Sequence, residues 1–415
     1  MRDHDLTRLL NLKGMVLEGV LKETPSDVYL AVGTALGTPV CRKCGHGCLL
    51  VHSTRVRTVR HLDAFGRRTW LVFESRLIDC MSCGLGVEAF GFVDPGKRTS
   101  AAFRRWVGGL CAILPIKTVS EHVHVAEDTV RTIDKAYLKA EYPASDLSAL
   151  RTIAIDEIAY RKGHKYLTIV LNYDTGEVIW TGEGRREATL ATFFEAIGPA
   201  LSAQIEFVSM DMAAPFINAV KAACPKASIV FDRFHVAKHM NDAVNDTRKL
   251  TMAKADQDIR KGVKGKRFVL LKRGKSLTPE DQARLEELLT LNTDLTKAYL
   301  MKEDLQQFWT CPSEAAAAVF LDTWITEAQG SGIAPVAKVG RMLGRHRDGL
   351  LAYHRKKISN GPLEGLNLKI NVLRRSRYGF RDLEYFGLKI RQLSILRSRR
   401  RHQKYPILED EKEAA

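Results

Sequence analysis

The sequence predicts a multidomain α+β protein with a cysteine-containing β domain, a helical domain, and an α/β core that an all-α insertion interrupts. Two Cys-x-x-Cys pairs flank strand-like sequence near the N-terminus, and short β-branched runs alternate with helical spacing from residue 150 onward. More than a hundred residues between His235 and Ser359 show helical periodicity and no strand signal. The β domain is predicted at 1–97 and the helical domain at 98–148. The α/β core is predicted at 149–237 and continues with its C-terminal helices at 357–400, the insertion occupies 238–356, and a disordered tail follows at 401–415.

The composition indicates an anionic partner. The chain has 415 residues, which is too long for one ordinary core, and its 64 Lys and Arg against 48 Asp and Glu give a net charge of +16. Nucleic acid or an anionic membrane would suit this charge, but no run of about 18 apolar residues is present. The N-terminal sequence MRDHDLTRLL does not have the features of a secretory signal. We therefore expect a cytoplasmic protein whose eight cysteines are thiols or metal ligands.

The two Cys-x-x-Cys pairs predict a structural zinc site. Cys41 and Cys44 form the first pair, and Cys80 and Cys83 form the second. Four thiolates make the closed tetrahedral set that zinc prefers, and alternating residues at 55–59 and 68–73 predict a hairpin between the pairs. His46 and Cys48 are alternative ligands, and four ordinary buried thiols are the alternative to a metal site.

The next segment predicts a helix-turn-helix domain. One helix begins after Ser100 and ends at Pro115, and helices at 117–123 and 127–140 are separated by three residues. In a helix-turn-helix the second helix enters the major groove of DNA. Its exposed side chains are predicted to be Thr129, Arg131, Thr132 and Lys135. A plain helical hairpin is the alternative, because Glu127 and Asp128 are poor neighbours for phosphates.

From residue 151 the pattern predicts a mixed α/β domain. Strands are expected at 151–157, 165–172 and 177–181, followed by a helix at 186–197, a strand at 205–209, a helix through Lys221 and a strand at 228–231. Three antiparallel strands followed by helix, strand, helix and strand is the element order of the ribonuclease-H-like fold.

Three carboxylates occupy positions that suit a metal site in this domain. Asp156 is expected at the end of the first strand and Asp211 at the end of the fourth. If these strands are neighbours, both carboxylates lie at one edge of the sheet and can share Mg²⁺. Glu364 follows Asn360-Gly361-Pro362, a typical helix start, and supplies a third carboxylate. Two such ions can activate a water or a 3′-hydroxyl for phosphodiester chemistry.

The C-terminal region carries most of the excess positive charge. Between Lys338 and Lys404 there are nineteen Lys or Arg against four acids. Apolar residues interleave with helical spacing, so one face is expected to pack while the other contacts DNA phosphates. The residues predicted to bind DNA here are Lys369, Arg374, Arg375 and Arg377. A solvated helical face is the alternative.

The chain resembles transposases of the ISL3 insertion-sequence family. The resemblance rests on the order of the CxxC pairs, the helix-turn-helix pattern and the carboxylates, and on four segments and two short motifs: Ile155–Glu157, Ser209–Met212, Phe231–Val236, Asn360–Asn367, Arg374-Arg375 and Tyr378-Gly379-Phe380. It implies a DDE triad of Asp156, Asp211 and Glu364, holding two Mg²⁺ or Mn²⁺ ions. It also implies an all-α insertion before the glutamate.

The resemblance gives further expectations for individual residues. Asp232 and His235 match a D-x-x-H pattern beside the active site, where they are expected to support the triad; a capping or core histidine is the alternative for His235. Trp309 and Trp324 of the insertion are expected in its core, and stacking on a flipped DNA base is the alternative.

The function that these features predict is transposition in a bacterial cytoplasm, in association with the nucleoid. The zinc ribbon and the helix-turn-helix would bind the terminal inverted repeats of an insertion sequence. The acidic site would then cleave a strand and transfer its end to target double-stranded DNA, in a homodimer or larger assembly and without a membrane. Two alternatives are a transposase-derived DNA-binding regulator without catalysis and a ribonuclease-H-fold nuclease or resolvase.

Overall fold

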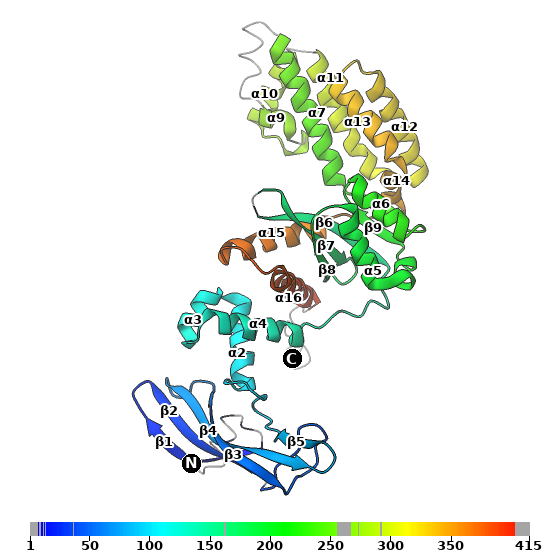
Figure 1. Cartoon of the computed structure of the whole chain (residues 1–415). Helices are drawn as coiled ribbons and strands as arrows, with labels where there is room; N and C mark the ends of the chain where they lie inside the picture. Colours follow the sequence, from blue (N-terminus) through cyan, green and yellow to red (C-terminus); the bar gives the residue numbers. More distant parts are fainter. Residues whose placement is uncertain are drawn as a thin grey trace, which may run out of the picture. The chain divides into compact units, whose positions relative to one another are not determined.

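The chain divides into two compact units in the computed structural model, residues 1–143 and 144–415 (Figure 1). The structure describes residues 7, 10, 12, 14–35, 37–161, 163–254, 267–272, 274–290 and 293–402. Most of the predicted disordered tail, residues 403–415, lies outside the described residues.

The first unit begins with a five-stranded sheet. Its strand order is β1-β2-β4-β3, with β5 paired to β4, and only the β2–β4 pair is parallel. The hairpin predicted between the two Cys-x-x-Cys pairs is the antiparallel pair β3–β4, in which Val59 lies opposite Leu71. Both side chains are buried and belong to the core of this sheet. The strands are β1 (Met15–Glu23), β2 (Asp27–Thr34), β3 (Val51–Arg60), β4 (Arg68–Cys80) and β5 (Gly84–Val87).

Three helices follow, at the predicted positions. They are α2 (Ala101–Ile113), α3 (Ile116–Val123) and α4 (Glu127–Glu141). The Ser100 hydroxyl accepts the amide N–H of Phe103 at 3.1 Å and so caps α2. His124 ends α3 in the left-handed conformation, which produces the turn before α4. Buried apolar side chains from all three helices form one small core around Phe103, Val107 and Val130.

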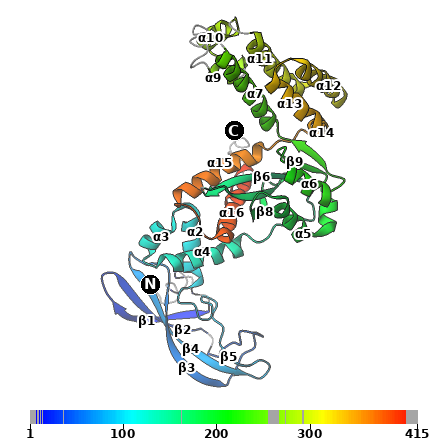
Figure 2. The same cartoon turned by 45° about the horizontal axis from the view of Figure 1, so that its top comes forward.

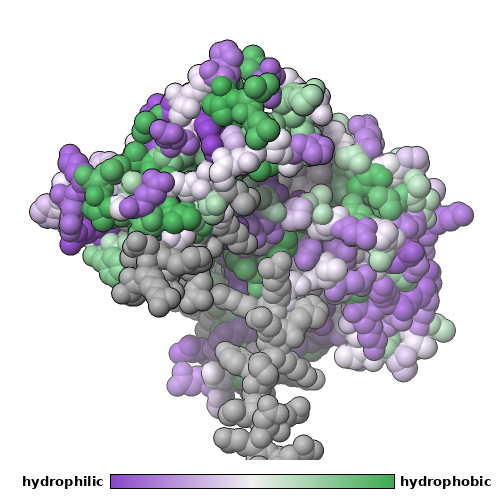
Figure 3. Space-filling model, turned by 90° about the horizontal axis from the view of Figure 1, so that it is seen from below, coloured by the Kyte–Doolittle hydropathy of each residue, from purple (hydrophilic) through white to green (hydrophobic). Residues whose placement is uncertain are grey.

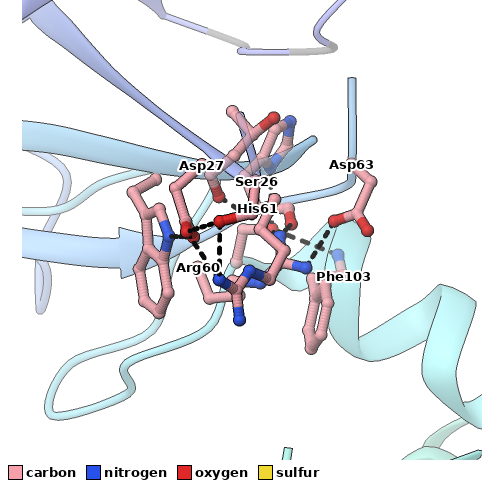
Figure 4. A network of polar contacts seen from close by, with 10 residues as sticks. Ser26, Asp27, Arg60, His61, Asp63 and Phe103 are labelled. Carbon is pink, nitrogen blue, oxygen red and sulfur yellow. Dashed lines mark hydrogen bonds and ion pairs between the residues drawn. The ribbon is translucent and has the colours of Figure 1, made fainter. Parts of the chain in front are cut away.

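Arg60 and His61 connect the sheet to α2 (Figure 4). The His61 Nε2 atom lies 2.8 Å from the carbonyl of Leu10, so this nitrogen carries the proton and Nδ1 accepts the Ser100 hydroxyl at 2.9 Å. The Arg60 guanidinium donates to the His61 carbonyl at 2.6 Å and lies over the Phe103 ring. The β region and the helices of residues 1–143 are therefore joined through buried polar contacts.

The second unit contains a five-stranded mixed sheet with the order β10-β9-β6-β7-β8. The pairs β6–β7 and β7–β8 are antiparallel, whereas β6–β9 and β9–β10 are parallel. The sequence predicts this order of strands and helices. Its elements are β6 (Thr152–Arg161), β7 (Lys165–Asn172), β8 (Val178–Glu183), α5 (Glu187–Ala203), β9 (Phe207–Met210), α6 (Ala214–Ala223) and β10 (Ser228–Phe231).

The largest differences from the predicted boundaries are at the ends of β6 and α5. The first strand does not end at the carboxylates, because the ladder with β7 continues through Ile158↔Leu167 and Asp156 therefore lies inside β6. Helix α5 runs past residue 197 to Ala203, with a kink at Gly198, where φ is 78° and Pro199 follows.

Helices cover both faces of this sheet. α5 and α6 lie on one side, and α15 (Gly361–Ser376) and α16 (Leu383–His402) lie on the other (Figures 1 and 2). Ile153 and Ile155 pack in the same core as Phe193 of α5 and Val220 of α6. Because side chains alternate along a strand, Asp156 points to the opposite face, toward α15.

The segment between β10 and α15 is helical throughout its described residues, as predicted. It comprises α7 (Arg233–Lys254), α9 (Arg267–Leu271), η1 (Gly274–Ser276), α10 (Pro279–Thr290), α11 (Thr293–Leu305), η2 (Gln306–Thr310), α12 (Glu314–Gly330), α13 (Ala334–Arg345) and α14 (Arg347–Arg355). Trp324 is buried in its core, and its indole N–H donates to the Met301 carbonyl at 3.1 Å. The same hydrophobic cluster includes Phe231 of the sheet and Leu350 of α14, so the insertion packs continuously onto the sheet.

Hydrophobic and hydrophilic residues are mixed on the one face that Figure 3 shows. On the face drawn in Figure 3, hydrophobic residues form separate groups among hydrophilic ones. Across the described part of the chain, none of the helices combines the length and apolar character that crossing a membrane requires.

Candidate functional site

Helix α15 is aligned on β6 by three side chains seven residues apart. Asn360, at the start of the helix, donates to the Ile155 carbonyl at 3.2 Å, and Asn367 donates to the Asp156 carboxylate at 2.7 Å. Arg374 donates to the Ala159 carbonyl. A spacing of seven returns to the same helical face after two turns, so these contacts fix both the rotation and the direction of α15 over the strand.

Both carboxylate oxygens of Asp156 accept a hydrogen bond. One of its oxygens accepts the Glu157 backbone N–H at 2.9 Å and the other accepts Asn367. Burial raises the pKa of Asp156 to about 6, and the neighbouring Asp211 carboxylate adds to the rise, whereas His235 opposes it. A carboxyl with these neighbours is costly to ionise unless a cation is present.

Asp211 reaches the same edge of the sheet from the adjacent strand. The parallel register pairs Ala154 of β6 with Ser209 of β9, so Asp156 and Asp211 each lie two residues beyond a matched pair. One Asp211 oxygen accepts the Ala213 N–H at 3.0 Å in the turn before α6. The two predicted aspartates are therefore brought together, and both raise the pKa of Glu157 and of His235.

Asp232 and His235 lie beside these carboxylates. Asp232 directly follows β10, is buried, and its N–H donates to the Met210 carbonyl of the neighbouring strand at 3.0 Å. His235, in the first turn of α7, has Nδ1 3.2 Å from the Asp232 carboxylate. This hydrogen bond raises the pKa of His235, and Asp211 and Asp156 contribute in the same direction. The direction of this shift favours the protonated form of the imidazole beside these acids.

Glu364 lies in the first turn of α15. Burial and the Asp232 carboxylate raise its pKa, while His235 and Arg233 oppose the rise. Among the described residues, only the four cysteines offer three or more metal-ligand atoms within 4.8 Å of one another. Glu364 therefore lies near Asp232 and His235, and the carboxylates of Asp156, Asp211 and Glu364 do not all lie within 4.8 Å of one another.

Sequence reasoning gave no role to three residues of this site. Glu157 is next to Asp156, and burial with Asp211 and Asp156 nearby raises its pKa to about 7. Asn360 is fully buried and accepts the Ser209 hydroxyl at 2.6 Å, which ties α15 to β9 as well as to β6. Asn367 holds Asp156. The seven-residue spacing of the two asparagines is the sequence signal that could have found them.

The four predicted cysteine ligands come together at the end of β4. Their sulfurs all lie within 4.8 Å of one another, and the Cys44 and Cys80 sulfurs are 3.5 Å apart. A backbone hydrogen bond from Ser82 lowers the pKa of Cys80 to about 6, which favours a thiolate. Cys48 instead donates toward the His46 carbonyl at 3.6 Å, and burial raises its pKa to about 11. The two alternative ligands, His46 and Cys48, are not part of the cluster.

The residues predicted to bind DNA differ in their exposure. On α4, Thr129 and Thr132 are exposed, while Arg131 and Lys135 are half-buried. The Arg131 guanidinium forms an ion pair with Asp128 at 2.5 Å.

On α15, Lys369 and Arg375 are exposed, Arg377 is half-buried, and Arg374 is used in the contact with β6. Arg374 therefore holds the helix in place, which the prediction of a DNA contact did not anticipate.

Known proteins resemble the chain over most of its length. A family model described as a transposase, of the ISL3 DDE type, matches residues 153–390, and a model of the helix-turn-helix domain of transposase family ISL3 matches residues 88–138. The chain belongs to the ISL3 family of transposases. It is 33% identical over 356 residues to the transposase for insertion sequence element IS1001 of Bordetella parapertussis, covering 85% of this chain and 88% of that protein. It is 29% identical over 367 residues to the transposase for IS1557 of Mycobacterium tuberculosis, covering 82% of each.

Membership of this family confirms the predicted class. The protein is an enzyme that acts on DNA, and α3 and α4 form a helix-turn-helix rather than a plain hairpin. The matched core begins at β6 and ends in α16, so one family model spans the sheet, the insertion and α15.

Proposed function

We propose that this transposase cleaves and transfers DNA strands with Asp156, Asp211 and Glu364 as its catalytic triad, on a ribonuclease-H-like core. The register of β6 and β9 carries the proposal, because it brings two half-buried acids to one edge of a parallel strand pair. α15 then adds Glu364 from a segment that is more than two hundred residues away in sequence from β6.

The site suits divalent cations bound through oxygen. Its ligands are hard carboxylates, and burial together with the Asp211 carboxylate raises the pKa of Asp156, an effect that a bound cation would oppose. Mg²⁺ or Mn²⁺ would supply activation of a water or 3′-hydroxyl and neutralise charge on the phosphodiester.

The other residues of the site orient the triad. Asn367 and the Glu157 N–H hold both oxygens of Asp156, so the carboxylate has a defined direction before DNA arrives. His235, held by Asp232, reduces the mutual repulsion of the nearby acids when its imidazole is protonated. Phosphoryl transfer depends mainly on positioning and charge neutralisation, so no covalent protein intermediate is required.

We also propose that the cysteine cluster binds structural zinc and that the first unit recognises the terminal inverted repeats. In a tetrahedral site with Zn–S distances of about 2.3 Å, neighbouring sulfurs lie about 3.8 Å apart, close to the 3.5 Å between Cys44 and Cys80. Four protein ligands leave no open position for catalysis. As expected from the family, two DNA ends would be joined by at least two copies of the chain.

Cleavage of a labelled duplex tests the proposal. One duplex carries the end of the element and a second carries a scrambled sequence, each with Mg²⁺ or Mn²⁺. Wild type is compared with Asp156→Asn and with Asp174→Asn, which changes an exposed carboxylate between β7 and β8. We expect metal-dependent nicking at the repeat boundary by wild type and Asp174→Asn, and none by Asp156→Asn with repeat binding retained. Repeat binding without cleavage by wild type, even with paired ends, would favour the regulator. Equal cutting of the scrambled duplex would favour a nuclease.

A further inference from the structure

Helix α15 ends in a turn where an aromatic residue occupies a position that usually holds glycine. The Gly379 N–H donates to the Arg374 carbonyl at 2.9 Å, and the Tyr378 N–H donates to the Arg375 carbonyl at 3.2 Å. This is the hydrogen-bond pattern of a Schellman motif, whose left-handed residue is typically glycine because it has no Cβ. Tyr378 adopts that conformation here, with φ at 56°. For a bulky residue this is an outlier, and the fold itself would be served as well by glycine.

Within the described protein, no contact of the Tyr378 side chain compensates this strain. Its relative exposure is 96%, and among the described residues its ring has no aromatic partner or side-chain hydrogen bond. Leu368 and Val372, four residues apart on the same helix, are also exposed, at 70% and 65%. Three large apolar side chains are therefore exposed on α15 and the turn that follows it.

The charge around these side chains identifies the partner. Residues 365–381 contain five Lys or Arg and no acid. Lys369, Arg375 and Arg381 are exposed. Apolar side chains flanked by basic residues are the arrangement by which proteins unstack base steps in DNA, with the cations on the phosphates and the apolar group against the bases.

The turn is anchored at a fixed distance from the acidic site. The Arg161 guanidinium, at the end of β6, donates to the Phe380 carbonyl at 3.3 Å, and the Phe380 ring stacks on Phe386 of α16. Arg161 is five residues from Asp156, which is about 16 Å along a strand at about 3.3 Å per residue. For a duplex whose axis follows β6, at about 3.4 Å per base pair, this distance corresponds to about five base pairs.

We propose that Tyr378 stacks against a base of the bound DNA about five base pairs from the scissile phosphate and unstacks that step, with Leu368 and Val372 widening the same apolar contact. This inference rests on the proposed function, because it takes the scissile phosphate to lie at Asp156. Tyr378 is a positioning residue, which holds the DNA end in a bent form that brings the phosphate to the carboxylates.

Fluorescence of 2-aminopurine tests the inference. The base analogue is placed at each of the first eight positions from the cleavage point, on both strands, and bound to the full chain carrying Asp156→Asn so that the DNA stays intact. We expect a fluorescence rise near position five that is lost in Tyr378→Gly and kept in Tyr378→Trp. In the chain with Asp156 intact, Tyr378→Gly should slow cleavage about fivefold to about 150-fold, the range to which the free energy of one aromatic–base stack corresponds.

The glycine variant separates a DNA contact from a structural role. Glycine relieves the left-handed strain, so the melting temperature of Tyr378→Gly should equal or exceed that of wild type while activity falls. The matched control is Phe65→Gly, which removes another exposed left-handed aromatic before a glycine, in the turn between β3 and β4. It should leave the fluorescence signal unchanged.

Several results would overturn the inference while leaving the proposed function intact. One is that wild type cleaves the repeat duplex and Tyr378→Gly shows the same fluorescence signal and the same cleavage rate as wild type. Another is a lower melting temperature that accounts for the lost activity. Loss of self-association in Tyr378→Gly with an unchanged fluorescence signal would assign this face to a second copy of the chain. Failure of wild type to cleave any repeat duplex would instead refute the proposed function.

Discussion

Replacing Asp156 by asparagine tests whether the protein maintains a buried negative charge at the expense of its own stability. The Asp156 carboxylate accepts the Glu157 N–H and the Asn367 amide. An asparagine can keep the first bond through its oxygen. It can donate to Asn367 if that amide turns over, since the Asn367 Oδ1 atom is buried without a hydrogen-bond partner among the described residues. The substitution therefore removes charge with little loss of hydrogen bonding.

The expected gain follows from the pKa of Asp156. Burial raises this pKa from 3.8 to about 6, so between these values the folded protein binds more protons than the unfolded chain. Stability therefore falls as the pH rises from about 4 to about 6 and stays reduced above that. Two pH units correspond to about 3 kcal/mol, so Asp156→Asn should be about 3 kcal/mol more stable than wild type at pH 8 and about 1.5 kcal/mol more stable at pH 5.

Urea denaturation of the full chain measures this difference, with zinc retained and Mg²⁺ omitted. Asp174→Asn removes an exposed carboxylate and should change the free energy of unfolding by less than about 0.5 kcal/mol at either pH. The reasoning is refuted if Asp156→Asn is less stable than wild type at pH 8, or if its advantage is the same at both pH values. Either result would mean that the pKa of Asp156 is not raised in the folded protein.

Three other substitutions test separate parts of the structure. Cys44→Ser should release zinc and lower the melting temperature of the first unit, because metal binding supplies folding free energy in such small sites. The zinc content of the purified protein checks this, and a variant with full zinc content would contradict it. Asn360→Ala leaves the Ser209 hydroxyl and the Ile155 carbonyl without their partner at a buried site, so the free energy of unfolding measured in urea should fall by about 3 kcal/mol. A fall of less than about 1 kcal/mol would show that the contact is dispensable. Arg375→Ala should weaken binding to repeat and scrambled DNA equally and reduce the salt-dependence slope by about one, whereas a change confined to the repeat would indicate base recognition.

Much of the fold follows from local sequence signals. The predicted strands at 165–172 and 228–231 match β7 and β10, because buried β-branched runs bounded by turn residues leave few alternatives. The break at His124 separates α3 from α4 as predicted, since the Val119 and Val130 faces on either side must turn inward to one small core. These elements are determined by residues that lie close together in the sequence.

The parts that the sequence did not reveal depend on contacts between distant segments. The strand carrying Asp156 appears to end at the carboxylates when the chain is read locally, yet β6 continues because β7 pairs with it as far as Arg161. Arg374 looks like a phosphate contact beside Arg375, but its guanidinium reaches a carbonyl 215 residues earlier in the chain. Composition cannot distinguish a basic residue that binds DNA from one that fastens a helix.

The contacts of α15 also explain how the core tolerates a long insertion. The chain leaves the sheet after Phe231 and returns through α14, where Gly349 packs so closely on the Phe231 ring that a Cβ would lie 2.3 Å from it. That contact brings the chain back to the sheet, but it does not orient α15. The orientation comes from Asn360 and Asn367, whose bonds to β6 and β9 are independent of the helices in between. The position of Glu364 relative to the two aspartates is therefore set by the contacts of α15 with β6 and β9 rather than by contacts within the insertion.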